Sequence, residues 1–164
     1  MSLRRRSYEP GHSPKFMVVI DDTPECDRAL YFASRRALRI GASVLMLRVI
    51  DMHDRNQQWL GVADIMRAEA HEEANAALDR SAARASSISG RPPERVIREG
   101  DMAEEILKLI EEDEDVAVLI LAASSNTDEP GPLVSSLAKT AGSFPIPVAI
   151  VPGHLSDEDL DSMT

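Results

Sequence analysis

The sequence has few aromatic residues and a single cysteine. Among its 164 residues are one Trp, two Tyr, three Phe and only one Cys, at position 26. Small aliphatic side chains must therefore build the core, and a chain of this length suits one domain with a sizeable core. A single cysteine excludes an internal disulfide, which is typical of the reducing cytoplasm. We accordingly expect a cytoplasmic protein.

Positive charge and long apolar segments are also lacking. The 18 Lys and Arg residues stand against 28 Asp and Glu residues, which leaves a formal net charge of -10. Nucleic acids and anionic membranes attract positive surface, so we expect no nucleic-acid partner and no membrane partner. No apolar run approaches the ~20 residues that span a bilayer. The basic N-terminal stretch lacks the apolar centre of a signal peptide.

Apolar segments alternate with helical patterns along the chain. Five segments rich in aliphatic residues predict strands, at 15–20, 43–50, 94–99, 116–121 and 145–152. Helical spacing between them predicts helices that begin at Thr23–Pro24, run over 58–87, begin at Asp101 with Glu104 in a capping box, and run over 133–141. Continuous apolar strands that alternate with helices indicate a parallel sheet covered on both faces.

The predicted fold is a single-domain open α/β sandwich with a five-stranded parallel sheet of order 3-2-1-4-5. The α/β domain spans residues 15–152. We expect residues 1–14 to be a disordered basic leader and residues 153–164 to be a frayed acidic tail. In such a sheet, ligands bind beyond the carboxyl ends of the strands where the strand order reverses. The loops DDTPE (21–25) and AASSNTDEPGPLVSS (122–136) would converge there.

Four segments together resemble the universal stress protein family. They are VVIDDTPECDRAL, GASVLMLRVID, REGDMAEEILKLIEEDEDVAVLILAAS and FPIPVAIVP, and they occur in the family's order over nearly the whole domain. The resemblance implies a UspA-like domain with a Rossmann-like fold of the adenine nucleotide alpha hydrolase type. It implies a stress-response protein that acts by binding and dimerisation, and not an enzyme.

Nucleotide-binding members carry Gly-x2-Gly-x9-Gly-Ser/Thr after the fourth strand. That spacing aligns here with Ala122, Ser125, Ser135 and Ser136, and a shifted alignment places Val134–Ser135 at the last pair. Neither alignment restores a glycine. Glycine lets a backbone approach phosphate closely, so its loss favours AMP or adenosine over ATP. Hydroxyl and amide side chains in the loop, among them Ser124, still offer many donors.

The resemblance therefore implies a degenerate adenine-nucleotide site that binds AMP or ATP weakly. Its residues would be Asp21, Asp22, Thr23, Val49, Ala122, Ser124, Ser125, Ser135 and Ser136. Purely structural roles remain open for several of them. Either aspartate could satisfy loop amides, Thr23 could be only a helix cap, and Val49 could be core.

No catalytic or metal-binding constellation stands out. The four histidines lack the spacing of metal ligands, and Cys26 is flanked by acids that oppose a thiolate. We expect no catalytic residue and no metal. The alternatives to a weak nucleotide binder are a nucleotide-free regulatory or scaffold dimer and a weak nucleotide hydrolase. The short apolar strand from Pro147 to Pro152 predicts a homodimer through this strand, because an exposed apolar edge invites pairing.

Overall fold

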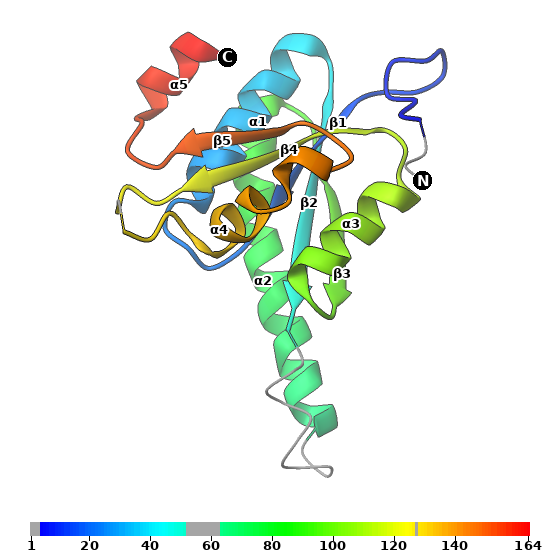
Figure 1. Cartoon of the computed structure of the whole chain (residues 1–164), viewed down its shortest axis with the longest axis vertical. Helices are drawn as coiled ribbons and strands as arrows, with labels where there is room; N and C mark the ends of the chain where they lie inside the picture. The colour runs from blue at the N-terminus through cyan, green and yellow to red at the C-terminus, as the bar shows by residue number, and fades with distance from the viewer. Residues whose placement is uncertain (1–3, 52–62, 127) are drawn as a thin grey trace.

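The computed structural model describes residues 4–51, 63–126 and 128–164 as a sheet flanked by helices (Figure 1). In chain order the elements are β1 (Lys15–Val19), α1 (Cys26–Ile40), β2 (Ser43–Ile50), α2 (Ala63–Ser89), β3 (Glu94–Glu99), α3 (Met102–Glu112), β4 (Val116–Ala123), α4 (Pro132–Ala138), a 3-10 turn (Ala141–Ser143), β5 (Val148–Pro152) and α5 (Asp157–Met163). Over the described ranges, none of these helices has both the length and the apolarity needed to cross a membrane.

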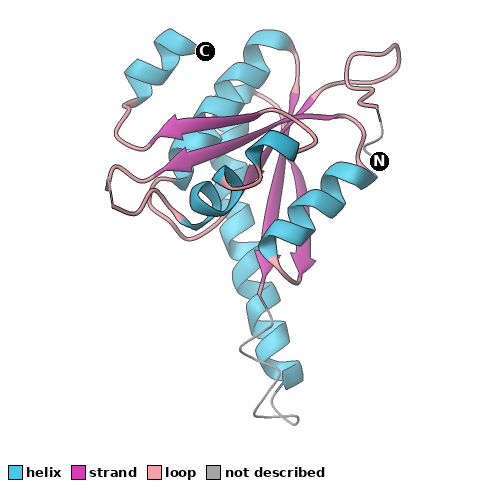
Figure 2. Cartoon of the chain, viewed as in Figure 1, coloured by secondary structure: helices cyan, strands magenta, loops and turns pink. Residues whose placement is uncertain are grey.

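The sheet has five parallel strands in the order β3-β2-β1-β4-β5, so the predicted fold class and strand order are confirmed. Figure 2 shows helices in front of and behind the strands. β1 occupies the middle position. Its residue Met17 pairs with Leu45 of β2 on one side and with Leu119 of β4 on the other. All carboxyl ends of the strands lie at one edge of the sheet, as the predicted ligand cleft requires.

Two buried clusters lie on the two faces of the sheet. Alternate residues of β1 point to opposite faces. Phe16 and Val18 pack with α1, α2 and α5, whereas Met17 and Val19 pack with α3 and α4. This two-sided burial explains why the strands appear in the sequence as continuous apolar runs.

The start of α1 differs from the prediction. The helix begins at Cys26, and Glu25 occupies the preceding position with a helical backbone and no side-chain cap. Thr23, expected as the cap, instead donates its hydroxyl proton to Asp21 Oδ1 over 2.5 Å. An aspartate two residues upstream competes for this hydroxyl and draws it away from the helix.

The last helices also differ in extent from their predicted ranges. The helix expected over 133–141 divides into α4 and a separate 3-10 turn at Ala141–Ser143. The final strand is shorter than the apolar run suggests, because Pro147 lies just before the first residue of β5. Residues 58–62 of the second predicted helix lie outside the described residues.

Residues 4–14, expected to be disordered, pack against the end of α3 and the turn that follows it. Arg5 Nη1 donates to the carbonyl oxygens of Ile110 (2.6 Å) and Asp113 (3.0 Å). Ser7 is buried and donates to the carbonyl of Asp115 over 2.9 Å, and His12 Nδ1 lies 2.7 Å from the Asp115 carboxylate. The last carbonyls of a helix have no partner within it, which is why a basic segment stabilises them.

The acidic tail, expected to fray, forms α5. Ser156 and Asp159 make a reciprocal capping box at its start. Leu160 is 1% exposed and packs into the cluster that includes α1. Asp157 and Asp161 pair with Arg28 and Tyr31 of α1, so the carboxylates have partners that their position in the sequence does not reveal.

Gly153 joins β5 to α5 where two backbone segments meet closely. Its N–H donates to Ala123 O over 2.8 Å. A Cβ placed on Gly153 would lie 2.5 Å from the same oxygen, which is shorter than any tolerated contact. The packing of α5 thus depends on the absence of a side chain at this position.

Gly153→Ala should therefore destabilise the protein. We expect the free energy of unfolding to fall by about 1–3 kcal/mol, the usual cost of forcing backbone apart in a packed region. Gly142→Ala is the matched control, because a Cβ at Gly142 has nothing within 4 Å. Urea unfolding would measure both variants. Equal losses in the two variants would contradict the close approach at Gly153.

Candidate functional site

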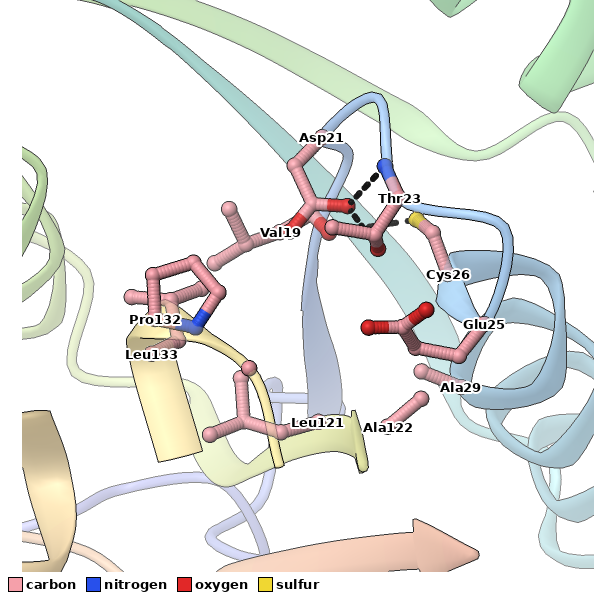
Figure 3. A pocket seen from close by; sticks show the side chains of 11 residues that line it. Val19, Asp21, Thr23, Glu25, Cys26, Ala29, Leu121, Ala122, Pro132 and Leu133 are labelled. Carbon is pink, nitrogen blue, oxygen red and sulfur yellow. Dashed lines mark hydrogen bonds between the residues drawn. The ribbon is translucent and has the colours of Figure 1, made fainter. Parts of the chain in front are cut away.

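The loops after β1 and β4 meet at the carboxyl edge of the sheet and enclose two hollows. The inner one is a small cavity of about 20 Å³, lined by Val19, Asp21, Thr23, Glu25, Cys26, Ala29, Leu121, Ala122, Gly131, Pro132 and Leu133 (Figure 3). The outer one is an open cleft of about 530 Å³, lined by Thr23, Pro24, Glu25, Ser124, Asn126, Asp128, Glu129, Gly131, Pro132 and Ser135. The inner cavity holds about one water, whereas the cleft is in the size range of small-molecule sites.

Asp21 and Thr23 organise the first loop. Asp21 Oδ1 accepts hydrogen bonds from the Thr23 backbone N–H (3.1 Å) and from its hydroxyl (2.5 Å). Both side chains line the inner cavity, and Thr23 also lines the cleft. Figure 3 shows the Asp21 carboxylate with one oxygen engaged by Thr23. The carboxylate therefore satisfies loop donors, as the structural alternative proposed, and still lies at the predicted position.

Asp22 lies on the other side of this loop. Its carboxylate accepts from Arg48 Nη1 (3.0 Å) and Nη2 (3.1 Å), and Arg48 also donates to Ile20 O. The hydrogen bonds from Arg48 lower the pKa of Asp22 below its ordinary value. Asp22 lines a separate groove between α1 and α2, of about 400 Å³, and is not among the residues around the inner cavity or the cleft.

Val49 is buried at 8% exposure in the cluster beneath α3 and α4. It belongs to the same cluster as Val19, Leu121 and Leu133, which line the inner cavity. Val49 itself lines neither hollow. Its observed role is packing, the alternative that the sequence left open.

The five predicted residues of the second loop divide into two groups. Ala122 lines the inner cavity, and Ser124 and Ser135 line the cleft. Ser125 and Ser136 are exposed and line neither hollow. Thr127, one of the expected donors in this loop, lies outside the described residues.

Much of the polar capacity of the second loop is used within the loop. The Ser124 backbone N–H donates to Pro130 O over 2.9 Å. Ser124 Oγ accepts from the Asn126 N–H, and Asn126 Oδ1 accepts from the Asp128 N–H, each over 3.1 Å. Two of the side chains that the sequence suggested as ligand donors, Ser124 and Asn126, therefore accept hydrogen bonds that hold the loop in shape.

Gly131, just before α4, has a backbone that other residues rarely adopt. Its φ is +118°, a region that strongly favours glycine. Gly131 lines both the inner cavity and the cleft. The alignment with the family's glycine motif did not include it, because that alignment placed serines at the motif positions. The Gly-Pro pair of residues 131 and 132 is the turn signal by which the sequence could have identified this position.

Glu25 is the main site residue that sequence reasoning missed. It lines both hollows, and Figure 3 shows its side chain reaching from the start of α1 toward the pocket. Its Oε1 atom lies 3.6 Å from the point where a Cβ of Gly131 would be. The only available signal was its place as the last loop residue before a helix at the reversal of strand order.

The charge around the cleft is negative. Glu25, Asp128 and Glu129 line it, and the described lining residues include no Lys, Arg or His. Within residues 4–51, 63–126 and 128–164, no group of three or more His, Cys, Asp and Glu side chains is placed to hold a metal ion. The described site therefore offers carboxylates and hydroxyls, but no cation, to a ligand.

Cys26 borders the inner cavity as a neutral thiol. Burial raises its pKa to about 12, and its Sγ donates to Val19 O over 3.4 Å. A thiol with this pKa stays protonated at neutral pH, so it has no nucleophilic character there. The charge of Asp27 raises the pKa of Cys26 further, as this flanking acid in the sequence suggested, whereas a hydrogen bond from the Asp21 backbone acts in the opposite direction.

Comparison with solved structures identifies proteins of the same fold. Universal stress protein UspA from Lactobacillus plantarum superposes with a TM-score of 0.71 at 17% identity, over 84% of this chain and 97% of that chain. A universal stress protein in complex with cAMP gives a TM-score of 0.60 at 17% identity, over 84% and 96%. The universal stress protein from Archaeoglobus fulgidus in complex with dAMP gives 0.59 at 16% identity, over 84% and 96%.

The sequence itself gives the evidence on family membership. A search among curated proteins found no significant match. The sequence model of the Universal stress protein family matches residues 13–152, which is most of the chain and includes all five strands. The chain therefore belongs to the universal stress protein family, and the resemblance of its four segments is confirmed.

Proposed function

We propose that this protein acts by binding a small adenosine-type ligand, a nucleoside or a nucleoside monophosphate, in the cleft between the loops after β1 and β4. The observation that carries the proposal is the cleft of about 530 Å³ at the reversal of strand order. Open α/β sheets bind ligands at this place. Two structural relatives were solved with cAMP and with dAMP, each an adenine nucleoside with one phosphate, which supports this ligand class.

We also propose that the protein works without turnover, in a stress response in the cytoplasm. Family membership supports the stress role. The neutral thiol of Cys26 supports binding in preference to covalent chemistry. The single unpaired cysteine supports a reducing compartment.

Self-association through β5 is the second part of the proposal. β5 is at the edge of the sheet that the described residues form, beside β4, and Ile150 at its middle is 50% exposed. An exposed apolar edge favours pairing with another strand, and the prolines at 147 and 152 limit that pairing to a short, closed contact. The tail helix α5 forms ion pairs and hydrogen bonds with α1, so the carboxylates of Asp157 and Asp161 are engaged there.

The ligand class is tested by titrating the purified protein with AMP and ATP in a calorimeter. We expect AMP to bind, and ATP to bind no more tightly, because acids line the cleft and the loop lacks the family's glycines. The same protein, denatured after purification, should release adenosine-type compounds for chromatography. ATP binding at least about tenfold tighter than AMP, or 1.4 kcal/mol, would contradict the proposal. Binding of neither ligand would favour the nucleotide-free regulatory dimer.

The placement of the site is tested by comparing Asp21→Ala with Asp128→Ala. Asp21→Ala removes the acceptor of two hydrogen bonds that shape the first loop. We expect it to weaken AMP binding about tenfold, the effect of losing one or two such bonds. Asp128 is an exposed acid at the rim, so Asp128→Ala should leave AMP binding equal or tighter. Equal losses in both variants would contradict the site as described.

The dimer is tested with Ile150→Lys. We expect the wild-type protein to have the mass of a dimer in light scattering at micromolar concentration. The variant should shift toward monomer, because two lysines would face each other across a two-fold contact. Leu38→Lys is a matched control, since Leu38 is also about half exposed (51%) but lies on α1. A monomeric wild-type protein would refute the dimer.

A further inference from the structure

We propose that Glu25 sets the ligand preference of this site by excluding negative charge from the part of the cleft beside the second loop. The site would then favour adenosine compounds whose 5′ substituent is neutral or positively charged over the corresponding phosphates. This inference rests on the proposed adenosine-type site and names the chemistry that the site selects. Its basis is the position, packing and pairing of one carboxylate.

The Glu25 side chain passes close to Gly153 and reaches Gly131. A Cβ on Gly153 would lie 3.2 Å from Glu25 Cβ, and a Cβ on Gly131 would lie 3.6 Å from Glu25 Oε1. The stem of the glutamate thus passes close to the end of β5, and its carboxylate reaches the residue before α4. Figure 3 shows the carboxylate on the opposite side of the pocket from Pro132 and Leu133. Glu25 therefore extends from the first loop across to the second.

Glu25 lies among acidic and uncharged side chains in the described lining of the cleft. Among the described residues, no side chain forms an ion pair with it or donates a hydrogen bond to it. Asp22, by contrast, is only a few residues away and is paired with Arg48. A half-buried, unpaired carboxylate repels an anion more strongly than a fully solvated one, because the local dielectric constant is lower. Asp128 and Glu129 at the rim add charge of the same sign.

A phosphate beside the second loop would therefore meet repulsion without a compensating cation. A hydroxyl or amine at the same place could instead donate a hydrogen bond to the Glu25 carboxylate. Adenosine should accordingly bind at least as tightly as AMP. Because the preference for adenosine over AMP depends on the Glu25 side chain, a substitution at this position can change that preference without changing the affinity for the adenosine moiety.

Glu25→Gln tests the assignment, because it removes the charge and keeps the size of the side chain. Calorimetric titration with adenosine and with AMP gives the ratio of the two affinities. We expect Glu25→Gln to shift this ratio toward AMP by about tenfold, as for a unit charge near a phosphate in a partly solvated cleft. Glu111→Gln is the control. Glu111 is exposed near the end of α3, at the opposite edge of the sheet, so the same charge change should shift the ratio by less than about twofold.

The outcomes separate this inference from the proposed function. If both ligands bind the wild-type protein but Glu25→Gln shifts the ratio no more than Glu111→Gln, the role of Glu25 is refuted and the adenosine site stands. If neither ligand binds the wild-type protein or Glu25→Gln, the site and the inference both fail. Thermal unfolding of each variant confirms that the compared proteins are folded. A selective gain for AMP in Glu25→Gln supports the inference.

Discussion

The central position of β1 is the constraint on which the rest of the structure depends. β1 pairs with β2 on one side and with β4 on the other, and both pairings are parallel. Parallel neighbours need crossover connections, and these connections are right-handed. The helices α1 and α2 therefore cover one face of the sheet, and α3 and α4 cover the other. The direction of winding reverses beside β1, and the loops after β1 and β4 border the cleft at this place.

The same reversal explains why the loop after β1 lies close to the segments that precede α4 and follow β5. Gly153, after β5, and Gly131, before α4, both adjoin Glu25, although more than 100 residues separate the glutamate from either. Burial of the strands sets these backbone distances, because the sheet cannot shift in register without exposing its apolar side chains. The charge of the cleft is thus held in place by the hydrophobic packing beneath it.

Charged residues at the two ends of the chain attach the terminal segments to this framework. Arg5 satisfies carbonyl groups at the end of α3, and Asp157 and Asp161 pair with side chains of α1. Each exposed ion pair contributes little on its own. Leu160 is fully buried, however, and its burial contributes about 1.5–3 kcal/mol, enough to keep α5 docked. Hydrogen bonds therefore hold the segment that begins at residue 4, whereas α5 combines polar contacts with the burial of Leu160.

The sequence by itself determined the fold, because burial on both faces leaves a continuous apolar run at each strand. The ranges predicted for β2 and β3 match the structure residue for residue. The expected strand order, which the structure confirms, also placed the loops after the first and fourth strands beside each other. Side-chain partners were beyond it. Arg48 donates hydrogen bonds to Asp22, and Thr23 donates its hydroxyl proton to Asp21. The carboxylates of these two predicted ligand-binding residues are therefore partly or wholly engaged within the protein.

Only the tertiary structure decided which side chains face the cleft. Val49 packs in the core and Ser125 faces solvent, while Glu25, which no motif singled out, reaches across to the second loop. Likewise, partners at the end of α3 hold the segment that begins at residue 4, and partners in α1 hold the tail helix α5. The physical reason is the same in each case. The periodicity of apolar residues along a chain indicates which side chains are buried. The partner of a charged group or a hydroxyl is a group that is distant in the sequence and close only after folding.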